Sequence, residues 1–311
     1  MDLGLRDRAY LVTGGSRGLG FAAAQALVAE GARVLISAPH EATATAAVAR
    51  LGQGDPPGAA DWVVADNADP AAPGQLIAAA RQRFGRLDGA LISVGGSPGG
   101  TIASITDDQW HSAFESVFLG AVRLARTLAA DLGAEREPGS GLGFGAGAGA
   151  GATGGGGAVG GGGAVGRDGA GGGDGAGGEA GAGSARTGTG GSIVFVLAAS
   201  VRAPLPGLGI SNGLFPGLAG VVKALADEHG PAGVRVNGVL PVRIATDRVR
   251  QLDALAGDPD EVRARLSRDI PLRRYGEPEE FGRTAAFLLS PAASYTTGAM
   301  IPVDGGAIRS F

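Results

Sequence analysis

The sequence predicts an α/β fold, with one domain built on a doubly wound, mostly parallel sheet of about seven strands. Three observations support this prediction. Short apolar runs alternate with stretches of helical periodicity, which is typical of a parallel sheet covered on both faces. A glycine-rich turn directly follows the first apolar run. Hydrophobic residues make up 44% of the 311 residues and charged residues only 18%, so the chain can bury a large core.

The apolar runs fix the expected strands. Each run is short and mostly apolar, as strands buried on both faces usually are. They lie at 9–12, 33–37, 61–65, 89–94, 193–199, 234–240 and 300–303. Helical stretches are expected between them, including Phe21–Ala29, 41–51, 71–84, 106–132 and 277–289.

The helix expected over 106–132 has the clearest signals. Thr106 and Gln109 form a capping box, in which each side chain satisfies a backbone N–H of the first turn. Apolar residues then recur at steps of three and four, which predicts one broad buried stripe. The stripe consists of Trp110, Phe114, Val117, Ala121, Leu124 and Leu128.

The turn Thr13–Gly20 carries the main functional signal. Strand, glycine turn and helix start follow in the order that builds a phosphate-binding loop. Glycines let the backbone approach a pyrophosphate, and free N–H groups at the helix N-terminus point at the anion. The alternative interpretation is a helix start with incidental glycines.

A glycine-rich segment interrupts the alternation. Between Gly139 and Gly191 there are 28 of the chain's 60 glycines, mostly alternating with alanine. Such a stretch cannot bury enough side chain to offset backbone ordering. We therefore expect residues 1–134 and 191–311 to form one domain, and 135–190 to be a flexible insertion. Only the amino-acid composition of the segment supports a role in partner docking.

Composition narrows the function classes. A net charge of −4 and a pI near 5.5 leave no basic stripe for nucleic acid. There are no cysteines, which excludes disulfides and thiolate metal sites. The three histidines have no ligand companions at metal spacing, so no metal is expected. Without a signal-like or membrane-spanning apolar stretch, the expected location is the cytoplasm.

The spacing TGxxxGxG resembles the short-chain dehydrogenase/reductase family, and in particular its 3-oxoacyl-ACP-reductase-like branch. Further motifs agree in order: Asp66 after the third strand, Leu87–Gly96 as the fourth strand and its following turn, Asn237–Thr246, Gly276–Glu280 and Val303–Gly306. The resemblance covers residues 5–134 and 191–311. It implies an NAD(P)-binding Rossmann domain, an oxidoreductase acting on a small carbonyl or alcohol substrate, and a homodimer or homotetramer.

The resemblance also assigns cofactor-binding positions. It implies a phosphate turn, an acid against the adenine, a turn after the fourth strand, and a loop closing over the nicotinamide. The residues at these positions are Gly14, Ser16, Arg17, Gly18, Leu19, Gly20, Asp66, Gly95, Pro241, Ile244 and Thr246. Ser37–His40 carries no acid where NAD binders hold the ribose, and Arg17 stands where NADP binders place a base. This favours NADP, with NAD and a simple loop arginine as the alternatives.

The family's catalytic residues are not found where the resemblance places them. The asparagine, serine, tyrosine and lysine positions fall on Val117, Ala198, Ser211 and Phe215. Ser200, Arg202 and Ser211 are the candidate substitutes. The alternatives are that Ser200 caps a strand, that Arg202 is solvated, and that the protein binds a dinucleotide without catalysis, as a sensor or partner subunit. Pro216 predicts that the helix here begins near Phe215, because proline costs about 3 kcal/mol inside a helix.

Overall fold

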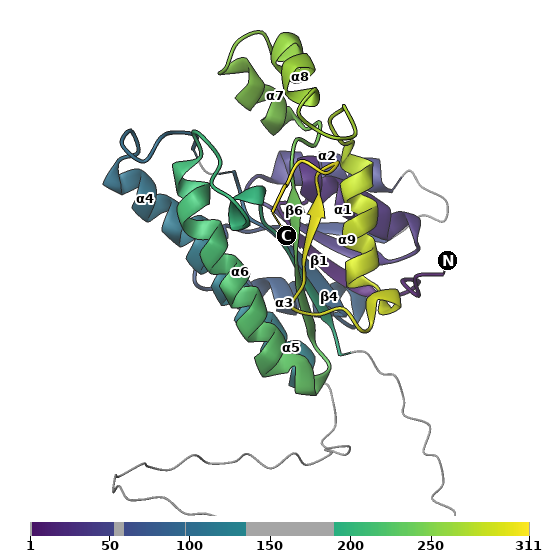
Figure 1. Cartoon of the computed structure of the whole chain (residues 1–311). Helices are drawn as coiled ribbons and strands as arrows, with labels where there is room; N and C mark the ends of the chain where they lie inside the picture. The colour runs from purple at the N-terminus through teal and green to yellow at the C-terminus, as the bar shows by residue number, and fades with distance from the viewer. Residues whose placement is uncertain (1, 53–58, 97, 135–189, 311) are drawn as a thin grey trace, which may run out of the picture. The chain divides into compact units, whose positions relative to one another are not determined.

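A computed structural model describes residues 2–52, 59–96, 98–134 and 190–310, and Figure 1 shows the arrangement of their elements. This part of the chain forms a seven-stranded parallel sheet in the order β3-β2-β1-β4-β5-β6-β7. The predicted fold class is confirmed.

The strands lie close to the apolar runs that predicted them. They are β1 (Ala9–Thr13), β2 (Arg33–Ala38), β3 (Ala60–Val64), β4 (Gly89–Ser93), β5 (Ser192–Val196), β6 (Arg235–Pro241) and β7 (Met300–Val303). The largest difference is at β5, which ends three residues before the predicted end at 199 and leads into the 3-10 turn η2 (Ala199–Val201).

The helices cover both faces of the sheet. They are α1 (Gly18–Ala29), α2 (Glu41–Leu51), α3 (Ala72–Phe84), α4 (Asp107–Ala113), α5 (Gly120–Ala134), α6 (Gly209–His229), α7 (Asp247–Ala254), α8 (Pro259–Ser267) and α9 (Pro278–Leu289). Residues of α1, α2 and α9 share one buried hydrophobic cluster, and residues of α3, α5 and α6 share the other. In Figure 1, α9 and α1 lie on one side of the sheet and α5 and α6 on the other.

Two helices differ from the prediction. The helix expected over 106–132 has its capping box, but a π-helical turn, Phe114–Leu119, separates α4 from α5. Because π-helical hydrogen bonds run from i to i+5, this turn shifts the α-helical register. Phe114 is therefore 43% exposed, stacked on Phe118, rather than part of the buried stripe.

The predicted start of α6 near Phe215 is wrong. The helix begins at Gly209 and runs through Pro216. Pro216 has no N–H to offer the Asn212 carbonyl, but the Asn212 side chain anchors this first part of the helix. Its amide accepts a hydrogen bond from the N–H of Leu205 (2.8 Å) and donates one to the Leu205 carbonyl (2.9 Å).

The predicted insertion at 135–190 lies outside the described residues, apart from Gly190. The described residues that border it lie close together. A Cβ placed on Gly133 would lie 3.3 Å from the Ala232 Cβ, and one on Gly190 would lie 2.6 Å from the Ala232 carbonyl oxygen. The end of α5 and the start of β5 therefore meet at the same residue.

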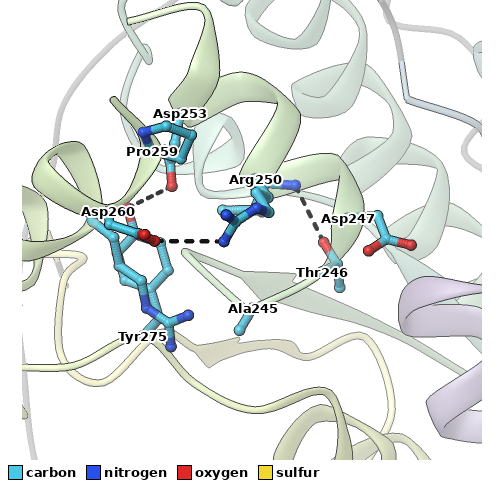
Figure 2. A pocket seen from close by; sticks show the side chains of 10 residues that line it. Ala245, Thr246, Asp247, Arg250, Asp253, Pro259, Asp260 and Tyr275 are labelled. Carbon is cyan, nitrogen blue, oxygen red and sulfur yellow. Dashed lines mark hydrogen bonds and ion pairs between the residues drawn. The ribbon is translucent and has the colours of Figure 1, made fainter. Parts of the chain in front are cut away.

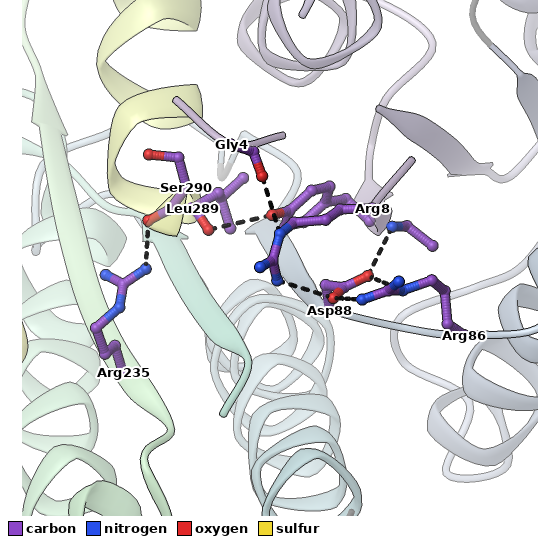
Figure 3. Close-up of polar contacts among 9 residues, drawn as sticks. Gly4, Arg8, Arg86, Asp88, Arg235, Leu289 and Ser290 are labelled. Carbon is purple, nitrogen blue, oxygen red and sulfur yellow. Dashed lines mark hydrogen bonds and ion pairs between the residues drawn. The ribbon is translucent and has the colours of Figure 1, made fainter. Parts of the chain in front are cut away.

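The amino ends of the strands are joined by polar contacts (Figure 3). Asp88, directly before β4, accepts hydrogen bonds from Arg8 Nη1 (3.1 Å), Arg86 Nε (2.7 Å) and the N–H of Ala9 (2.8 Å). Arg235 donates to the carbonyls of Leu288 and Ser290 at the end of α9, both at 2.9 Å. Burial lowers the pKa of this guanidinium to about 10. This edge of the sheet is therefore occupied by structural contacts.

No helix among the described residues is long and apolar enough to cross a membrane.

Candidate functional site

Successive strands are added on one side of β1 from β1 to β3 and on the other side from β4 to β7, so the strand order reverses between β1 and β4. Ligands of open α/β sheets bind beyond the carboxyl ends of the strands at this point. The ends of the two strands are joined by a side chain. Thr13 Oγ1 donates to the Ser93 carbonyl (3.0 Å) and accepts from the Ser93 N–H (2.9 Å). A glycine-rich turn follows each strand, so the two glycine-rich turns lie side by side.

The turn after β1 needs glycine for both conformation and space. Gly14 and Gly18 have φ values of +60° and +56°, a region that disfavours other residues. A Cβ on Gly20 would lie 2.4 Å from the Gly14 carbonyl oxygen, so α1 packs directly on the turn. At Gly18 a Cβ would meet only Thr246 Cγ2, at 3.9 Å. The first turn of α1 has no acidic residue, and its N-cap Arg17 makes no side-chain capping hydrogen bond. This helix end suits an anion.

The segment after β6 faces both glycine turns. Thr246 is the N-cap of α7 and accepts a hydrogen bond from the N–H of Val249 (3.3 Å). Its methyl group is the atom nearest to the open side of Gly18, and a Cβ on Gly96 would lie 3.0 Å from Arg248 Nε. Gly95 has no atom within 4 Å of an added Cβ. The start of α7 therefore lies over the region between the two turns.

The remaining predicted cofactor residues lie at the same edge of the sheet. Asp66 follows β3, is exposed, and accepts a hydrogen bond from the N–H of Ala68 (2.9 Å). Pro241 ends β6, and Ile244 is buried and pairs with Gly276. The positive φ of this loop is at Arg243 (+51°), two residues after Pro241. Sequence reasoning did not anticipate this conformation, because arginine rarely adopts it.

The structure brings Ser200 and Ser211 together. Ser200 is 5% exposed in η2, and its hydroxyl donates a hydrogen bond to the carbonyl of Ser211 (3.1 Å). Ser211 is 7% exposed in the first turn of α6. Arg202 is exposed at the end of η2. The Ser200 hydroxyl is therefore used to tie η2 to α6.

The positions that the resemblance assigns to catalysis are packed with apolar groups. Phe215 (8% exposed) lies one turn after Ser211 on the same face of α6, and Val117 (4%) lies in the π-helical turn. Both belong to one hydrophobic cluster, and Ala198 packs against it. The single lysine of the sequence, Lys223, is exposed further along α6.

The three tyrosines of the sequence lie elsewhere. Tyr10 is buried in β1, and its hydroxyl donates to the Leu289 carbonyl (3.3 Å). Burial raises its pKa above the ordinary value. Tyr295 is fully exposed, and Tyr275 lies beside α7.

A small cavity of about 120 Å³ lies between α7 and α8, and Figure 2 shows its lining. Asp253 on its wall accepts hydrogen bonds from Arg243 Nη1 (2.7 Å) and from the Tyr275 hydroxyl (3.1 Å). Burial raises the pKa of Tyr275. Sequence analysis missed this cluster and both helices that carry it, because its partners are 10 and 22 residues from Asp253 and share no local pattern.

Comparison with known proteins agrees with this geometry. Residues 8–143 match the family model described as short chain dehydrogenase, and residues 180–307 match the one described as enoyl-(acyl carrier protein) reductase. The chain belongs to the short-chain dehydrogenase/reductase family. Its fold, its glycine turn and its oxidoreductase class are thus those of a family that binds NAD(P).

Similar members of the family include reductases. The chain is 27% identical over 303 residues to the short-chain reductase protein NovJ of Streptomyces niveus, covering 97% of this chain and 94% of that one. It is 28% identical over 317 residues to levodione reductase of Leifsonia aquatica, covering 98% and 96%. Its fold resembles L-sorbose reductase of Gluconobacter frateurii in complex with NADPH and L-sorbose, with a TM-score of 0.77, 24% identity and full coverage of both chains.

Proposed function

We propose that this family member binds NADP(H) between the two glycine turns and is an oxidoreductase of a small carbonyl or alcohol compound with an altered proton-donating site. The observation that carries the proposal is the glycine turn after β1. Its open side at Gly18 and the uncapped start of α1 leave backbone N–H groups directed toward the space where a pyrophosphate would bind.

The residues present fit this group. A Cβ at Gly18 would meet only the Thr246 methyl group, at 3.9 Å, and one at Gly95 would meet nothing within 4 Å, so backbone can approach a ligand at both turns. We propose that Gly14–Gly20 hold the pyrophosphate, that Asp66 contacts the adenine, and that the segment from Pro241 to Thr246 covers the nicotinamide. The cofactor would supply or accept a hydride at the substrate carbon.

We propose NADP rather than NAD from the residues around β2. The end of this strand and the N-cap of α2, Ser37–His40, have no carboxylate to bond the ribose hydroxyls. The N–H of Gly15 donates to the Ser37 carbonyl (3.2 Å), which holds the glycine turn against the end of β2. Arg17 is exposed in this turn, and a guanidinium is well suited to a phosphate.

The substitute residues can hold a substrate oxygen, but they donate protons poorly. Arg202 can stabilise negative charge on this oxygen, and it stays protonated because guanidinium pKa values are far above neutral. The hydroxyls of Ser200 and Ser211 can orient the oxygen, although Ser200 must first release the Ser211 carbonyl. Loss of a positioned acid typically costs about 10²- to 10⁴-fold in rate, so we expect slow turnover.

The hydrogen bond from the Ser200 hydroxyl to the Ser211 carbonyl supports a second candidate function. This candidate is a dinucleotide-binding protein without catalysis that acts as a sensor or partner subunit. In this case Ser200 and Phe215 serve only to pack α6. A cytoplasmic homodimer or homotetramer remains a prediction under both candidates.

Titration with NADPH and NADH, followed by a panel of carbonyl substrates on the same preparation, tests the proposal. We expect nucleotide fluorescence to change at submillimolar NADPH, and any turnover to fall at least tenfold in Ser200→Ala and Arg202→Ala, about 1.4 kcal/mol each. No change at millimolar NADPH would refute the cofactor site. Binding with turnover below roughly one per hour, far under the usual enzyme range, would establish the noncatalytic candidate.

A further inference from the structure

The start of α7 covers the proposed cofactor site, but hydrophobic packing does not hold this helix. Asp253, at 3% exposure, is the one buried residue of this fully described helix. The other side chains of α7 are exposed or half-buried. Buried carboxylates are rare unless they are paired, so the partners of Asp253 decide where the helix lies.

Those partners come from two segments outside α7, and Figure 2 shows one of them, Tyr275. Arg243, in the loop after β6, bonds one carboxylate oxygen at 2.7 Å. The Tyr275 hydroxyl, before α9, donates to the other at 3.1 Å. The Tyr275 ring is 2% exposed, and the guanidinium carbon of Arg263 on α8 lies 5.2 Å from its centre. One carboxylate thus ties α7 to both segments.

The two segments are also fixed to one another. The N–H of Gly276 donates to the Arg243 carbonyl (3.1 Å), and the N–H of Ala245 donates to the Gly276 carbonyl (2.8 Å). Thr246 follows directly and begins α7. The loop, residues 275–276 and the end of α7 therefore form a closed set of contacts around Asp253.

The opposite end of α7 faces the site. Thr246 Cγ2 is the nearest atom to the open side of Gly18, and Arg248 Nε lies over Gly96. A shift of the helix would move both side chains, because a short helix transmits a displacement of one end to the other.

We propose that Asp253 is a positioning residue for cofactor binding, which acts through Arg243 and Tyr275 to set the start of α7 over the two glycine turns. This inference rests on the proposed function, because the ligand it names is NADPH. The role of Asp253 in placing α7 does not depend on the proposed function.

The test compares Asp253→Ala with a matched control, Asp88→Ala. Asp88 is also a nearly buried carboxylate, 8% exposed at its side chain, with several hydrogen bonds, but it lies at the amino ends of the strands (Figure 3). Both variants should lower the thermal midpoint. Only Asp253→Ala should weaken NADPH binding, by at least tenfold. Tyr275→Phe removes one of the two hydrogen bonds and should give a smaller loss, which provides a second variant if Asp253→Ala fails to fold.

Hydrogen exchange without nucleotide separates this proposal from the cofactor assignment. The backbone amides of residues 244–254 should exchange faster in Asp253→Ala and Tyr275→Phe than in the parent protein. Their exchange rates should be unchanged in Asp88→Ala. If the parent protein does not bind NADPH, the proposed function fails while the exchange result still decides the role of Asp253. Equal weakening of NADPH binding in the Asp253 and Asp88 variants, or unchanged exchange at 244–254, would overturn the proposal.

Discussion

Substitution of Gly18 by alanine separates the strain of the glycine turn from its proposed role in phosphate binding. Gly18 has a φ of +56°, and an added Cβ would contact only Thr246 Cγ2, at 3.9 Å. The substitution therefore costs backbone strain of about 1–2 kcal/mol and little else. In a domain of this size, that lowers the thermal midpoint by roughly 2–8 °C.

The expected effect on NADPH binding is much larger. If a phosphate occupies the open side of Gly18, the Cβ displaces it from the N–H groups of the turn. Loss of two hydrogen bonds to a charged group, at about 1.5–3 kcal/mol each, weakens binding by roughly 10²- to 10⁴-fold.

Gly85→Ala is the matched control. Gly85 follows α3 with a φ of +74°, and an added Cβ there meets nothing within 4 Å. It lies ahead of β4, at the edge of the sheet opposite the proposed site. Calorimetry should give similar thermal midpoints for the two variants, and fluorescence titration should show lost NADPH binding for Gly18→Ala alone. Unchanged affinity in Gly18→Ala would refute phosphate binding at this turn.

Three further outcomes are expected. Arg17→Ala should weaken NADPH at least tenfold and leave NADH unchanged in parallel titrations, whereas equal effects would exclude a 2′-phosphate contact. Replacing 135–189 by a linker of about four residues should shift the thermal midpoint by less than about 4 °C, because the bordering residues meet at one place. The hydrogen bond from Arg274 lowers the pKa of Glu280 to about 2, so its stabilising contribution is complete above the ordinary value of 4.5 and is lost as pH falls toward 2. Urea midpoints of the parent and Glu280→Gln should therefore differ at pH 7 and converge only as the pH falls to about 2. A constant difference would contradict this ion pair.

The sequence predicted the sheet well because parallel strands are buried on both faces. The runs Ala9–Val12 and 193–196 contain only apolar residues, and both lie in strands that are buried over their whole length. The glycine turn was equally readable, since its spacing reflects the conformations of Gly14 and Gly18.

The helices α7 and α8 could not be predicted by the same reasoning. Periodicity methods look for an apolar stripe, and the buried position of α7 is Asp253. A carboxylate in a charged helix reads as solvated, and only its distant partners, Arg243 and Tyr275, reveal that it is buried. The signal for this cluster exists in three dimensions alone.

The start of α6 shows why the candidate catalytic site was harder to predict than the fold. Pro216 suggested a late helix start, but glycines at 213 and 217 let the rings of Trp110 and Phe118 lie against the helix, where added Cβ atoms would come within 2.7 and 2.8 Å. Ser211 and Phe215 therefore share a buried face of a continuous helix. A lysine at 215 would place an ammonium group in a hydrophobic cluster. Burial of an unpaired charge costs a large amount of folding free energy. The resemblance assigns this buried face to catalysis. If that assignment is right, we expect that placing a tyrosine at 211 and a lysine at 215 requires a change in the surrounding core as well as the two substitutions.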